Sequence, residues 1–342
     1  MLKSEYSKVS IVIPTHNAAG TIKRCVDSIL AQTYQCFEVI IIDNGSTDNL
    51  VDIVNSYSDA RIKYFTTNKL GVSNARNMGI KKSKGEFVSF CDADDEYDPS
   101  FLAEMVNCSI TNNVGVVKCA IKKIYNNHEA VVEGLHDLPK RIMDPGKTRD
   151  REILRNVFFR ANRDQARCLV SSLLIRRDVL VDNNILFDNN VCMMEDVLFY
   201  ADLFNLNGKI AFIGDPLFYY HQNPDSATHA KNNYKKIIDG AIVSCSKLHE
   251  KLGEDPGVDM KYIMVIFHYM YCEYFANGKI YLPDSLIDIA QKANTENSSR
   301  LWRAVVKKIE NKNIKALILF FYFRKIKNIL RNRNGGISGG SV

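Results

Sequence analysis

Three carboxylates lie within four residues at the end of an apolar stretch. Residues 87–91 have the composition of a buried strand, and they are followed directly by Asp92, Ala93, Asp94 and Asp95. Carboxylates this close repel one another and raise one another's pKa unless a cation compensates them. Hard divalent cations prefer oxygen ligands, so the cluster is a candidate site for Mn²⁺ or Mg²⁺. A solvated acidic turn is the alternative that this short motif leaves open.

Polar residues also follow two other apolar stretches. Residues 9–14 are expected to form a strand that ends at Pro14, Thr15 and Asn17. Residues 37–43 are expected to form a second strand, which ends at Asp43 and Asn44. In open α/β sheets, ligands bind just beyond the carboxyl ends of the strands. The sequence therefore predicts that these turns share one edge of a sheet with the acidic cluster.

An alternation of strands and helices positions these turns. Apolar periodicity predicts strands at residues 9–14, 37–43, 62–65 and 87–91, and helices at 20–32 and 72–82. Such alternation predicts an α/β fold, with a mostly parallel sheet covered by helices on both faces. Farther along, strands are expected at 114–124, 170–176 and 209–213, and helices at 100–112 and 196–206. Residues 125–150 are expected to form an exposed segment.

The order and spacing of these turns resemble the nucleotide-sugar half of the GT-A glycosyltransferases of family 2. The resemblance rests on residues 14–17, 43–48, 68–79 and 92–95, and it extends from residue 9 to residue 228. It implies a GT-A, Rossmann-like fold: a mostly parallel sheet sandwiched by helices, with a helical C-terminal extension.

By this resemblance, the first two turns hold the uracil of a UDP-sugar. Asp43 is expected to accept a hydrogen bond from the uracil ring, and Pro14, Thr15 and Asn17 are expected to shape its pocket. Asn44 stands where a second Asp is frequent in the family.

The resemblance also implies roles around the diphosphate. Arg76 is expected beside the base or the phosphates. Asp92 is expected to contact the ribose, and Asp94, together with Asp92, to bind the Mn²⁺ or Mg²⁺ that bridges the diphosphate. Ala93 belongs to the same donor-binding turn, and Asp95 is expected on the sugar side.

A second acidic motif, Glu195-Asp196, opens an expected helix. Acids at this position also suit the helix dipole, which is the alternative explanation. The family carries a Glu-Asp pair here, so the resemblance implies that Asp196 is the general base and that Glu195 binds the acceptor or orients the site. A base is required because a sugar hydroxyl is a poor nucleophile at neutral pH. His221 lies in a segment where the family often has a basic residue near the diphosphate; a structural histidine is the alternative.

Composition bounds the setting. The chain has 342 residues, of which 46% are hydrophobic and 25% charged, as in ordinary soluble globular proteins. Its nine cysteines are scattered without a C-x-x-C, which indicates a reducing cytoplasm, with no disulfide framework and no zinc site. No signal peptide is expected, and no apolar stretch approaches the ~18–20 residues of a membrane span.

The domain organisation follows from the resemblance and the charge pattern. Residues 1–228 are expected to form the GT-A domain, with a donor half at 1–98 and an acceptor half at 99–228. Residues 229–334 are expected to form the helical extension, and 335–342 a disordered tail. Residues 300–334 contain 11 Lys or Arg and one acid, within a total net charge of +6. This segment suits either a helix on an anionic membrane or a helix packed on the core; no motif supports nucleic acid.

The resemblance therefore implies an inverting, metal-dependent glycosyltransferase that transfers a sugar from a UDP-sugar to a glycan hydroxyl. The acceptor is expected to be linked to undecaprenyl diphosphate, in surface polysaccharide synthesis such as that of a capsule. The enzyme is expected to be cytoplasmic and peripheral at the inner face of the membrane.

One rival is a UDP-sugar-binding scaffold, against which both intact acidic motifs argue. Another is a sugar nucleotidyltransferase, which would need a basic, Gly-rich loop where residues 14–20 have no Lys or Arg. A dinucleotide-linked dehydrogenase is disfavoured because no G-x-G-x-x-G follows a strand.

Overall fold

The computed structural model describes most of the chain. It covers residues 7–125, 129–133, 141–159, 168–191, 193–221, 234–277, 283 and 285–292, together with residues 303, 307 and 309. The chain divides into two compact units, Met1–Ala227 and Thr228–Val342.

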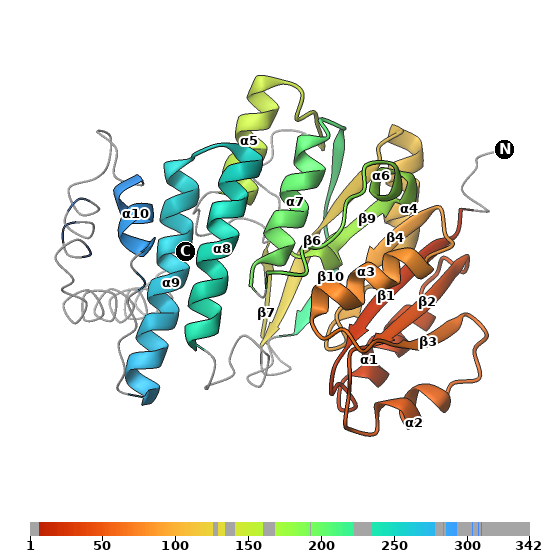
Figure 1. The fold of residues 1–342 in the computed structure, drawn as a ribbon. Coiled ribbons are helices and arrows are strands. Elements are labelled where there is room, and N and C mark those ends of the chain that lie inside the picture. Colours follow the sequence, from red (N-terminus) through yellow and green to blue (C-terminus); the bar gives the residue numbers. More distant parts are fainter. Residues whose placement is uncertain are drawn as a thin grey trace, which may run out of the picture. The chain divides into compact units, whose positions relative to one another are not determined.

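The first unit begins with four parallel strands in the order β3-β2-β1-β4 (Figure 1). They are β1 (Val9–Thr15), β2 (Phe37–Asp43), β3 (Ile62–Thr66) and β4 (Phe87–Phe90). The helices between them are α1 (Ile22–Leu30), α2 (Leu50–Asn55) and α3 (Val72–Lys82). Every residue of β1, β2 and β4 is buried, which explains why these strands read as continuous apolar stretches.

Helices cover both faces of this sheet because successive strand residues point to opposite sides. Val9, Ile11 and Ile13 pack in one cluster with residues of α1, α2 and α4 (Phe101–Asn112). Ile40 and Ile42 of β2 face the other way, where they pack with residues of α3. The α/β architecture predicted from the sequence is therefore confirmed.

The sheet continues through strands of mixed direction. They are β9 (Leu173–Arg176), β6 (Val116–Tyr125), β10 (Ile210–His221) and β5 (Glu96–Tyr97), in that spatial order after β4. β9 is antiparallel to both β4 and β6, so β6 has the same direction as β4, and β10 is parallel to β6. The helical elements of this part are α5 (Thr148–Phe158), the 3₁₀ helix η2 (Val170–Ser172), α6 (Arg177–Asp182) and α7 (Glu195–Asn205).

Two expectations about this part were wrong. Residues 125–150 are not one exposed segment: they include β7 (Glu129–Glu133), β8 (Ile142–Met143) and the start of α5. β7 and β8 are short and pair with the edges of β6 and β10, so their own composition carries little signal. The strand expected at 209–213 runs on to His221. Its apolar pattern is interrupted where the register shifts on either side of Pro216.

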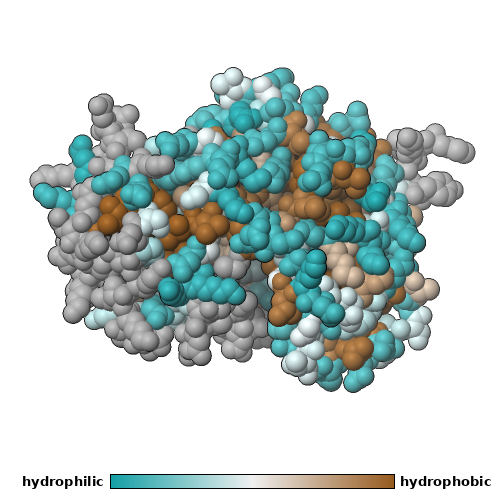
Figure 2. All heavy atoms as spheres, in the orientation of Figure 1, coloured by the Kyte–Doolittle hydropathy of each residue, from teal (hydrophilic) through white to brown (hydrophobic). Residues whose placement is uncertain are grey.

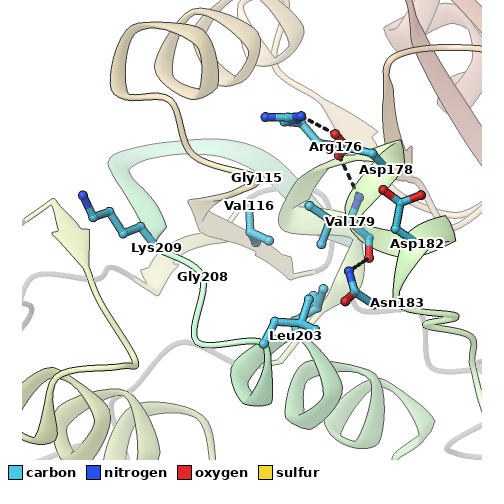
Figure 3. Close-up of a pocket in the computed structure, with 11 residues that line it drawn as sticks. Gly115, Val116, Arg176, Asp178, Val179, Asp182, Asn183, Leu203, Gly208 and Lys209 are labelled. Carbon is cyan, nitrogen blue, oxygen red and sulfur yellow. Dashed lines mark hydrogen bonds and ion pairs between the residues drawn. The ribbon is translucent and has the colours of Figure 1, made fainter.

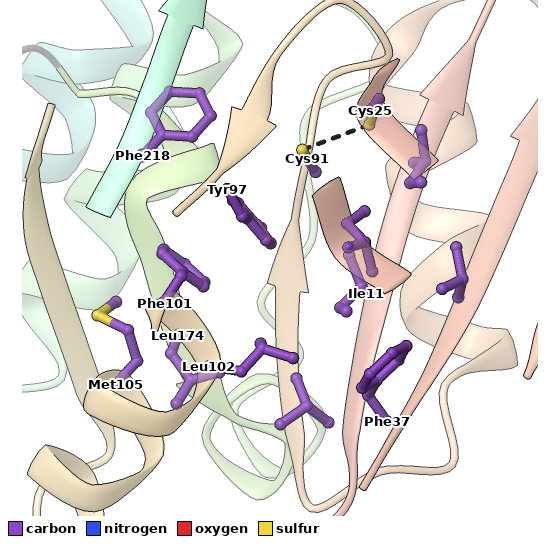
Figure 4. Close-up of a cluster of buried hydrophobic side chains, with 14 of the residues drawn as sticks. Ile11, Cys25, Phe37, Cys91, Tyr97, Phe101, Leu102, Met105, Leu174 and Phe218 are labelled. Carbon is purple, nitrogen blue, oxygen red and sulfur yellow. Dashed lines mark hydrogen bonds between the residues drawn. The ribbon is translucent and has the colours of Figure 1, made fainter. Parts of the chain in front are cut away.

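One aromatic cluster anchors the end of β4 (Figure 4). The ring of Tyr97 stacks on that of Phe101, with centroids 3.9 Å apart. The buried Tyr97 hydroxyl donates to the Phe90 carbonyl at 2.6 Å and lies 2.8 Å from the Ser89 hydroxyl. Each fully buried side chain of this size stabilises the fold by ~1.5–3 kcal/mol. Because Tyr97 contacts β4 and belongs to β5, it fixes both ends of the acidic turn at residues 92–95.

The described part of the second unit is helical. α8 (Tyr234–Leu252) packs against α9 (Pro256–Asn277), and α10 (Ser285–Lys292) packs against α9. Of the expected basic segment 300–334, only residues 303, 307 and 309 are described, and the expected tail 335–342 lies wholly outside the described residues. Within the described part of the chain, no helix has the length and apolarity needed to cross a membrane.

Among the coloured residues of Figure 2, hydrophilic residues are interspersed with patches of hydrophobic ones. The large hydrophobic residues exposed among those described include Val51, Leu70 and Val181, from separate elements. Singly exposed apolar residues of this kind are ordinary on soluble proteins.

Candidate active site

Three parallel strands end at the same edge of the sheet and bring the polar turns together. β1 and β2 stay in register to their last residues, Thr15 and Asp43. β4 lies on the other side of β1, and the Cys91 N–H donates to the Val12 carbonyl at 3.0 Å. The turn after each strand therefore begins at the carboxyl edge, where open α/β sheets bind ligands.

Asn17 joins the first turn to the second. Its backbone N–H donates to Ser46 Oγ at 2.9 Å, and its Oδ1 accepts from the Thr47 N–H at 2.8 Å. Asn17 has φ of 50°, a left-handed conformation in which Asn is enriched. Pro14 and Thr15 form the buried end of β1, one residue before Asn17. These three residues therefore set the backbone path of the expected base pocket.

Asp43 is held by two hydrogen bonds at the end of β2. Tyr64 Oη donates to its Oδ2 at 2.5 Å, and the Ser46 N–H donates to its Oδ1 at 2.8 Å. Burial alone would raise the pKa of Asp43, but these hydrogen bonds outweigh burial and leave the pKa below its ordinary value. An ionised carboxylate has about four acceptor positions, so lone pairs remain for an N–H of a ligand.

Asn44 supports a neighbouring loop. Its Oδ1 accepts from the Gly71 N–H at 2.7 Å, and its Nδ2 donates to the Lys69 carbonyl at 2.9 Å. Gly71 has φ of 113°, a conformation that glycine adopts readily, and α3 begins directly after it. The structure thus places this expected donor-binding residue on the backbone that leads to Arg76.

The acidic turn separates its carboxylates. Asp92 and Asp94 are partly exposed, whereas Ala93 is buried and Asp95 is only 1% exposed. Asp95 Oδ1 accepts the backbone N–H of His221 at 2.9 Å. The Asp95 carboxylate lies in the interior and ties β10 to the turn, and its expected place on the sugar side stays a prediction.

Three side chains that support the turn include two that the motifs did not indicate. Arg24 of α1 donates to the Asp94 carbonyl at 2.5 Å, and its Nε lies 3.2 Å from Glu96 Oε1. The same Glu96 oxygen lies 2.5 Å from His221 Nε2. Burial, and then Arg24, lowers the pKa of His221. His221 therefore lies close to the acidic turn through its contacts with Asp95 and Glu96, and its expected approach to the diphosphate stays a prediction.

Arg76 joins the two acidic motifs. Its guanidinium lies 2.9 Å from Asp92 Oδ1, 2.9 Å from Glu195 Oε1 and 2.8 Å from Asp196 Oδ1. The Arg76 side chain is 4% exposed, and the three carboxylates raise its pKa against the effect of burial. Arg76 is thus a buried counter-ion shared by both motifs, a role that its place in the sequence did not reveal.

Asp196 sits at the start of α7 with a raised pKa. Burial raises the pKa of Asp196 to about 8, Glu195 and Asp92 add to the rise, and Arg76 opposes it. The Val170 N–H lies 3.5 Å from its second oxygen. A carboxylate with a pKa near neutrality is suited to general base catalysis.

A buried lysine interacts electrostatically with Asp196, and the sequence analysis did not indicate it. Lys118 is fully buried, donates to Ser172 Oγ at 2.5 Å and lies 5.6 Å from the centroid of the Tyr200 ring. Burial lowers its pKa to about 8, and the charge of Asp196 opposes that shift. A lysine within an apolar strand is a pattern in the sequence that could have indicated a buried charge at this position.

The acidic turn fits a divalent cation. Burial, and then the charge of Asp92, raises the pKa of Asp94 to about 6. A bound cation would stabilise the ionised form of Asp94, which burial and Asp92 disfavour. The Asp92 and Asp94 oxygens are hard ligands suited to Mg²⁺ or Mn²⁺. Asp94 and Asp92 would hold the ion.

A separate surface pocket of about 320 Å³ lies at the opposite edge of the sheet (Figure 3). Its lining includes Gly115 and Val116 at the start of β6, and Arg176, which pairs in register with the first residue of β4. Arg176 and Asp178 form an ion pair on its wall. The pocket therefore lies away from the carboxyl edge that carries both acidic motifs.

The fold belongs to the GT-A class. The structure of residues 1–349 of Staphylococcus aureus TarS in complex with UDP-GlcNAc aligns with a TM-score of 0.61, covering 90% of this chain and 88% of that one at 19% identity. The mannosyltransferase PcManGT from Pyrobaculum calidifontis, in complex with GDP-Man and Mn²⁺, aligns with a TM-score of 0.51 at 15% identity, covering 91% and 86%.

The sequence comparisons point to one family over part of the chain. Residues 10–166 match the model of glycosyl transferase family 2. The glycosyltransferase EpsJ of Bacillus subtilis, whose activity is uncharacterised, is 28% identical over 68% of this chain and 65% of its own length. YibD of Escherichia coli, likewise uncharacterised, is 35% identical over 33% of each chain. This chain thus spans less than two thirds of either relative.

One further relative carries a specific name. The Escherichia coli protein WfgD, named as a UDP-Glc:α-D-GlcNAc-diphosphoundecaprenol β-1,3-glucosyltransferase, is 31% identical over 43% of this chain and 55% of its own length.

Proposed function

We propose that this protein transfers a sugar from a UDP-sugar to a hydroxyl of a lipid-linked glycan, with inversion at the anomeric carbon and with Mn²⁺ or Mg²⁺ as cofactor. The observation that carries the proposal is the Arg76 cluster, in which one buried guanidinium joins Asp92 of the acidic turn to Glu195 and Asp196. A metal-binding carboxylate and a base must lie close together for direct displacement at one sugar carbon.

The donor side follows from the first two turns and the acidic turn. Asp43 accepts from the base at the end of β2, and Asn17 and Asn44 hold the backbone around it. When bound at Asp92 and Asp94, a divalent cation would stabilise the charge that develops on the diphosphate leaving group. The TarS complex with UDP-GlcNAc supports UDP over GDP in this proposal.

The acceptor side uses Asp196. Asp196 takes the proton from the acceptor hydroxyl as that oxygen attacks the anomeric carbon, and the bond to the diphosphate breaks in the same displacement. Glu195 orients the acceptor, and Arg76 keeps Asp196 in place. An α-linked donor then yields a β-linked product, as in the name of WfgD, which also supports a diphosphoundecaprenol-linked acceptor. Such an acceptor implies work at the inner face of the membrane.

The first experiment measures release of the nucleoside diphosphate from a panel of UDP-sugars. GDP-Man is included because PcManGT was solved with it. We expect release from one UDP-sugar in Mn²⁺ or Mg²⁺, and its loss in EDTA. Release from GDP-Man alone would contradict the assigned nucleotide. Where no donor is hydrolysed without acceptor, calorimetry with UDP replaces the assay, and absence of metal-dependent UDP binding would reject the proposal.

A variant pair separates catalysis from scaffold binding. Asp196→Asn keeps the shape of the side chain but removes the base, so we expect at least ~100-fold slower transfer with donor binding retained. Asp52→Asn is the control, since Asp52 is exposed on α2. Equal turnover by Asp196→Asn and the parent would remove Asp196 from its assigned role. A parent enzyme that binds UDP-sugar but transfers to no glycan would favour the scaffold.

A further inference from the structure

The second unit contains a cluster of three possible metal ligands of different chemistry. Cys245 and His249 lie four residues apart on α8, so they share one face of that helix. Asp259 comes from the first turn of α9, which packs against α8. One ligand atom from each, Sγ, an imidazole nitrogen and a carboxylate oxygen, lies within 4.8 Å of the other two. Among the described residues, this is the group in which such ligands converge.

The distances suit a tetrahedral centre. His249 Nε2 lies 3.0 Å from Asp259 Oδ1, and Cys245 Sγ lies 3.7 Å from the same oxygen. With zinc–sulfur bonds of about 2.3 Å and zinc–nitrogen or zinc–oxygen bonds of about 2.0–2.2 Å, tetrahedral ligand atoms lie roughly 3.3–3.7 Å apart. The imidazole–carboxylate distance is a few tenths of an ångström below this range, the sulfur–carboxylate distance lies within it, and the sulfur and imidazole nitrogen lie within 4.8 Å of each other.

Burial and charge agree with the same occupant. Cys245 and Asp259 are each 1% exposed, and the His249 side chain is 14% exposed. A thiolate and a carboxylate carry two negative charges, which a divalent cation with a neutral imidazole balances to zero. A soft sulfur ligand beside nitrogen and oxygen selects zinc-like metals over Mg²⁺.

We propose that Cys245, His249 and Asp259 bind a zinc-class divalent metal ion that joins α8 to α9. Binding replaces the thiol proton of Cys245, which is released to water, by a sulfur–metal bond. Water fills the fourth position. The proposal is independent of the glycosyltransferase assignment, because it concerns another unit and other ligands.

The test is a titration of the full-length protein with Co²⁺ after chelator treatment, in excess Mg²⁺. Mg²⁺ occupies oxygen-only sites such as the acidic turn of the first unit, whereas Co²⁺ accepts sulfur. We expect a thiolate-to-cobalt charge-transfer band in the near ultraviolet that saturates at one equivalent and disappears when Zn²⁺ is added. A parent protein without this band would overturn the proposal.

Matched variants locate the sulfur. Cys245→Ser is expected to abolish the band. Cys272→Ser is the control, because Cys272 and His268 are also four residues apart on one helix, with Sγ and Nε2 3.9 Å apart, but belong to no such three-ligand group among the described residues. A band that survives in Cys245→Ser, or disappears in Cys272→Ser, contradicts the assigned ligand.

Thermal unfolding gives a second readout that does not depend on the band. Zn²⁺ is expected to raise the melting temperature of the parent and of Cys272→Ser, and to leave that of His249→Gln unchanged. Equal zinc-induced shifts in the parent and His249→Gln would mean that zinc binds elsewhere. Cys245, His249 and Asp259 would then form only a buried hydrogen-bonded cluster.

Discussion

At the scale of single residues, one arginine is shared by three carboxylates of the candidate site. Arg76 is 4% exposed and contacts Asp92, Glu195 and Asp196. A buried ion pair adds little stability over apolar packing, but removing one partner leaves uncompensated charges. Here the loss of Arg76 would leave three carboxylates without their shared cation.

Replacing Arg76 tests this reasoning. Arg76→Met is expected to lower the free energy of unfolding by roughly 3–5 kcal/mol, because three closely spaced and largely desolvated carboxylates lose their shared cation. Urea denaturation at neutral pH measures the change. Arg61→Met is the control: Arg61 pairs with Asp59 at the surface, where a loss of only ~0–1 kcal/mol is expected. Similar losses in the two variants would show that Arg76 contributes no more to the free energy of unfolding than Arg61 does.

Residue types at the site could be predicted from the sequence, but their partners could not. Asp92, Asp94, Glu195 and Asp196 stand out because of their spacing. The contact of Arg76 with them depends on where β4, α3 and α7 meet in space, which no local pattern encodes. Lys118 was missed although its signal, a lysine within an apolar strand, was visible.

At the scale of elements, a buried carboxylate fastens three strands to one another. Glu38 of β2 is 1% exposed and accepts from Ser10 of β1 at 2.7 Å and from Lys63 of β3 at 2.5 Å. Lys8 lies 3.1 Å from it, and the Lys84 N–H donates to it at 2.8 Å. Burial opposes ionisation, but these hydrogen bonds outweigh it and lower the pKa of Glu38 to about 2.

The Glu38 cluster predicts a dependence of stability on pH. A carboxyl group with a lower pKa in the folded state stabilises that state above its unfolded pKa, which is about 4.5 for Glu38. This contribution, on the order of 3 kcal/mol, is expected to disappear as the pH falls from about 4.5 towards 2. Urea titrations across this range measure it. Glu38→Gln should be less stable than the parent at pH 7 and should show a flatter acid dependence; an unchanged slope would contradict the assignment.

The docking of α3 on β1 makes a second prediction at this scale. A Cβ at Gly79 would lie 2.1 Å from Val12 Cγ1, so the close approach requires glycine. Gly79→Ala is therefore expected to destabilise the protein by ~1–3 kcal/mol, although alanine favours helices. Thermal melting measures the effect.

A second substitution checks the cause of that loss. Val12→Ala removes the methyl groups that meet the new Cβ, so adding it to Gly79→Ala should recover part of the lost stability. Gly208→Ala is the control, because a Cβ there meets nothing within 4 Å. Losses that simply add in the double variant would exclude the steric explanation.

Elements with strong periodicity could be predicted, and those held by their neighbours could not. β2 and α3 were predicted with their observed bounds, because each has an apolar pattern of its own. β5, β7 and β8 have two to five residues and depend on pairing with β10 or β6. The part of β10 after residue 213 was missed because Gly214, Asp215 and Pro216 interrupt its apolar pattern.

At the scale of the whole molecule, the sequence says much about the first unit and little about the second. The turns of the first unit match a family, whereas the second unit offers only helical periodicity. Its cluster of Cys245, His249 and Asp259 is invisible to spacing rules, because Asp259 joins the other two only when α9 packs on α8. The sequence-based expectation of no zinc site therefore rested on local motifs alone.

The basic segment at residues 300–334 makes a prediction for the full-length protein. Its cluster of Lys and Arg with aromatic residues suits an anionic membrane surface. Deleting residues 314–342 is expected to abolish co-sedimentation with vesicles that contain anionic lipid. Deleting only 335–342, which carries no charged side chain, is the control and should leave binding intact. A protein that still sediments after the longer deletion would place the contact elsewhere.

The shared arginine also constrains how this site can evolve. Because Arg76 neutralises acids from both motifs, a substitution at Asp92 changes the electrostatic setting of Asp196, and the reverse holds as well. The two motifs are therefore epistatic, and a lineage that loses one acid alters the selection on the others. Saturation scans of one position at a time would misjudge their tolerance, whereas libraries that vary Arg76 together with its three partners would reach viable combinations that single steps cannot.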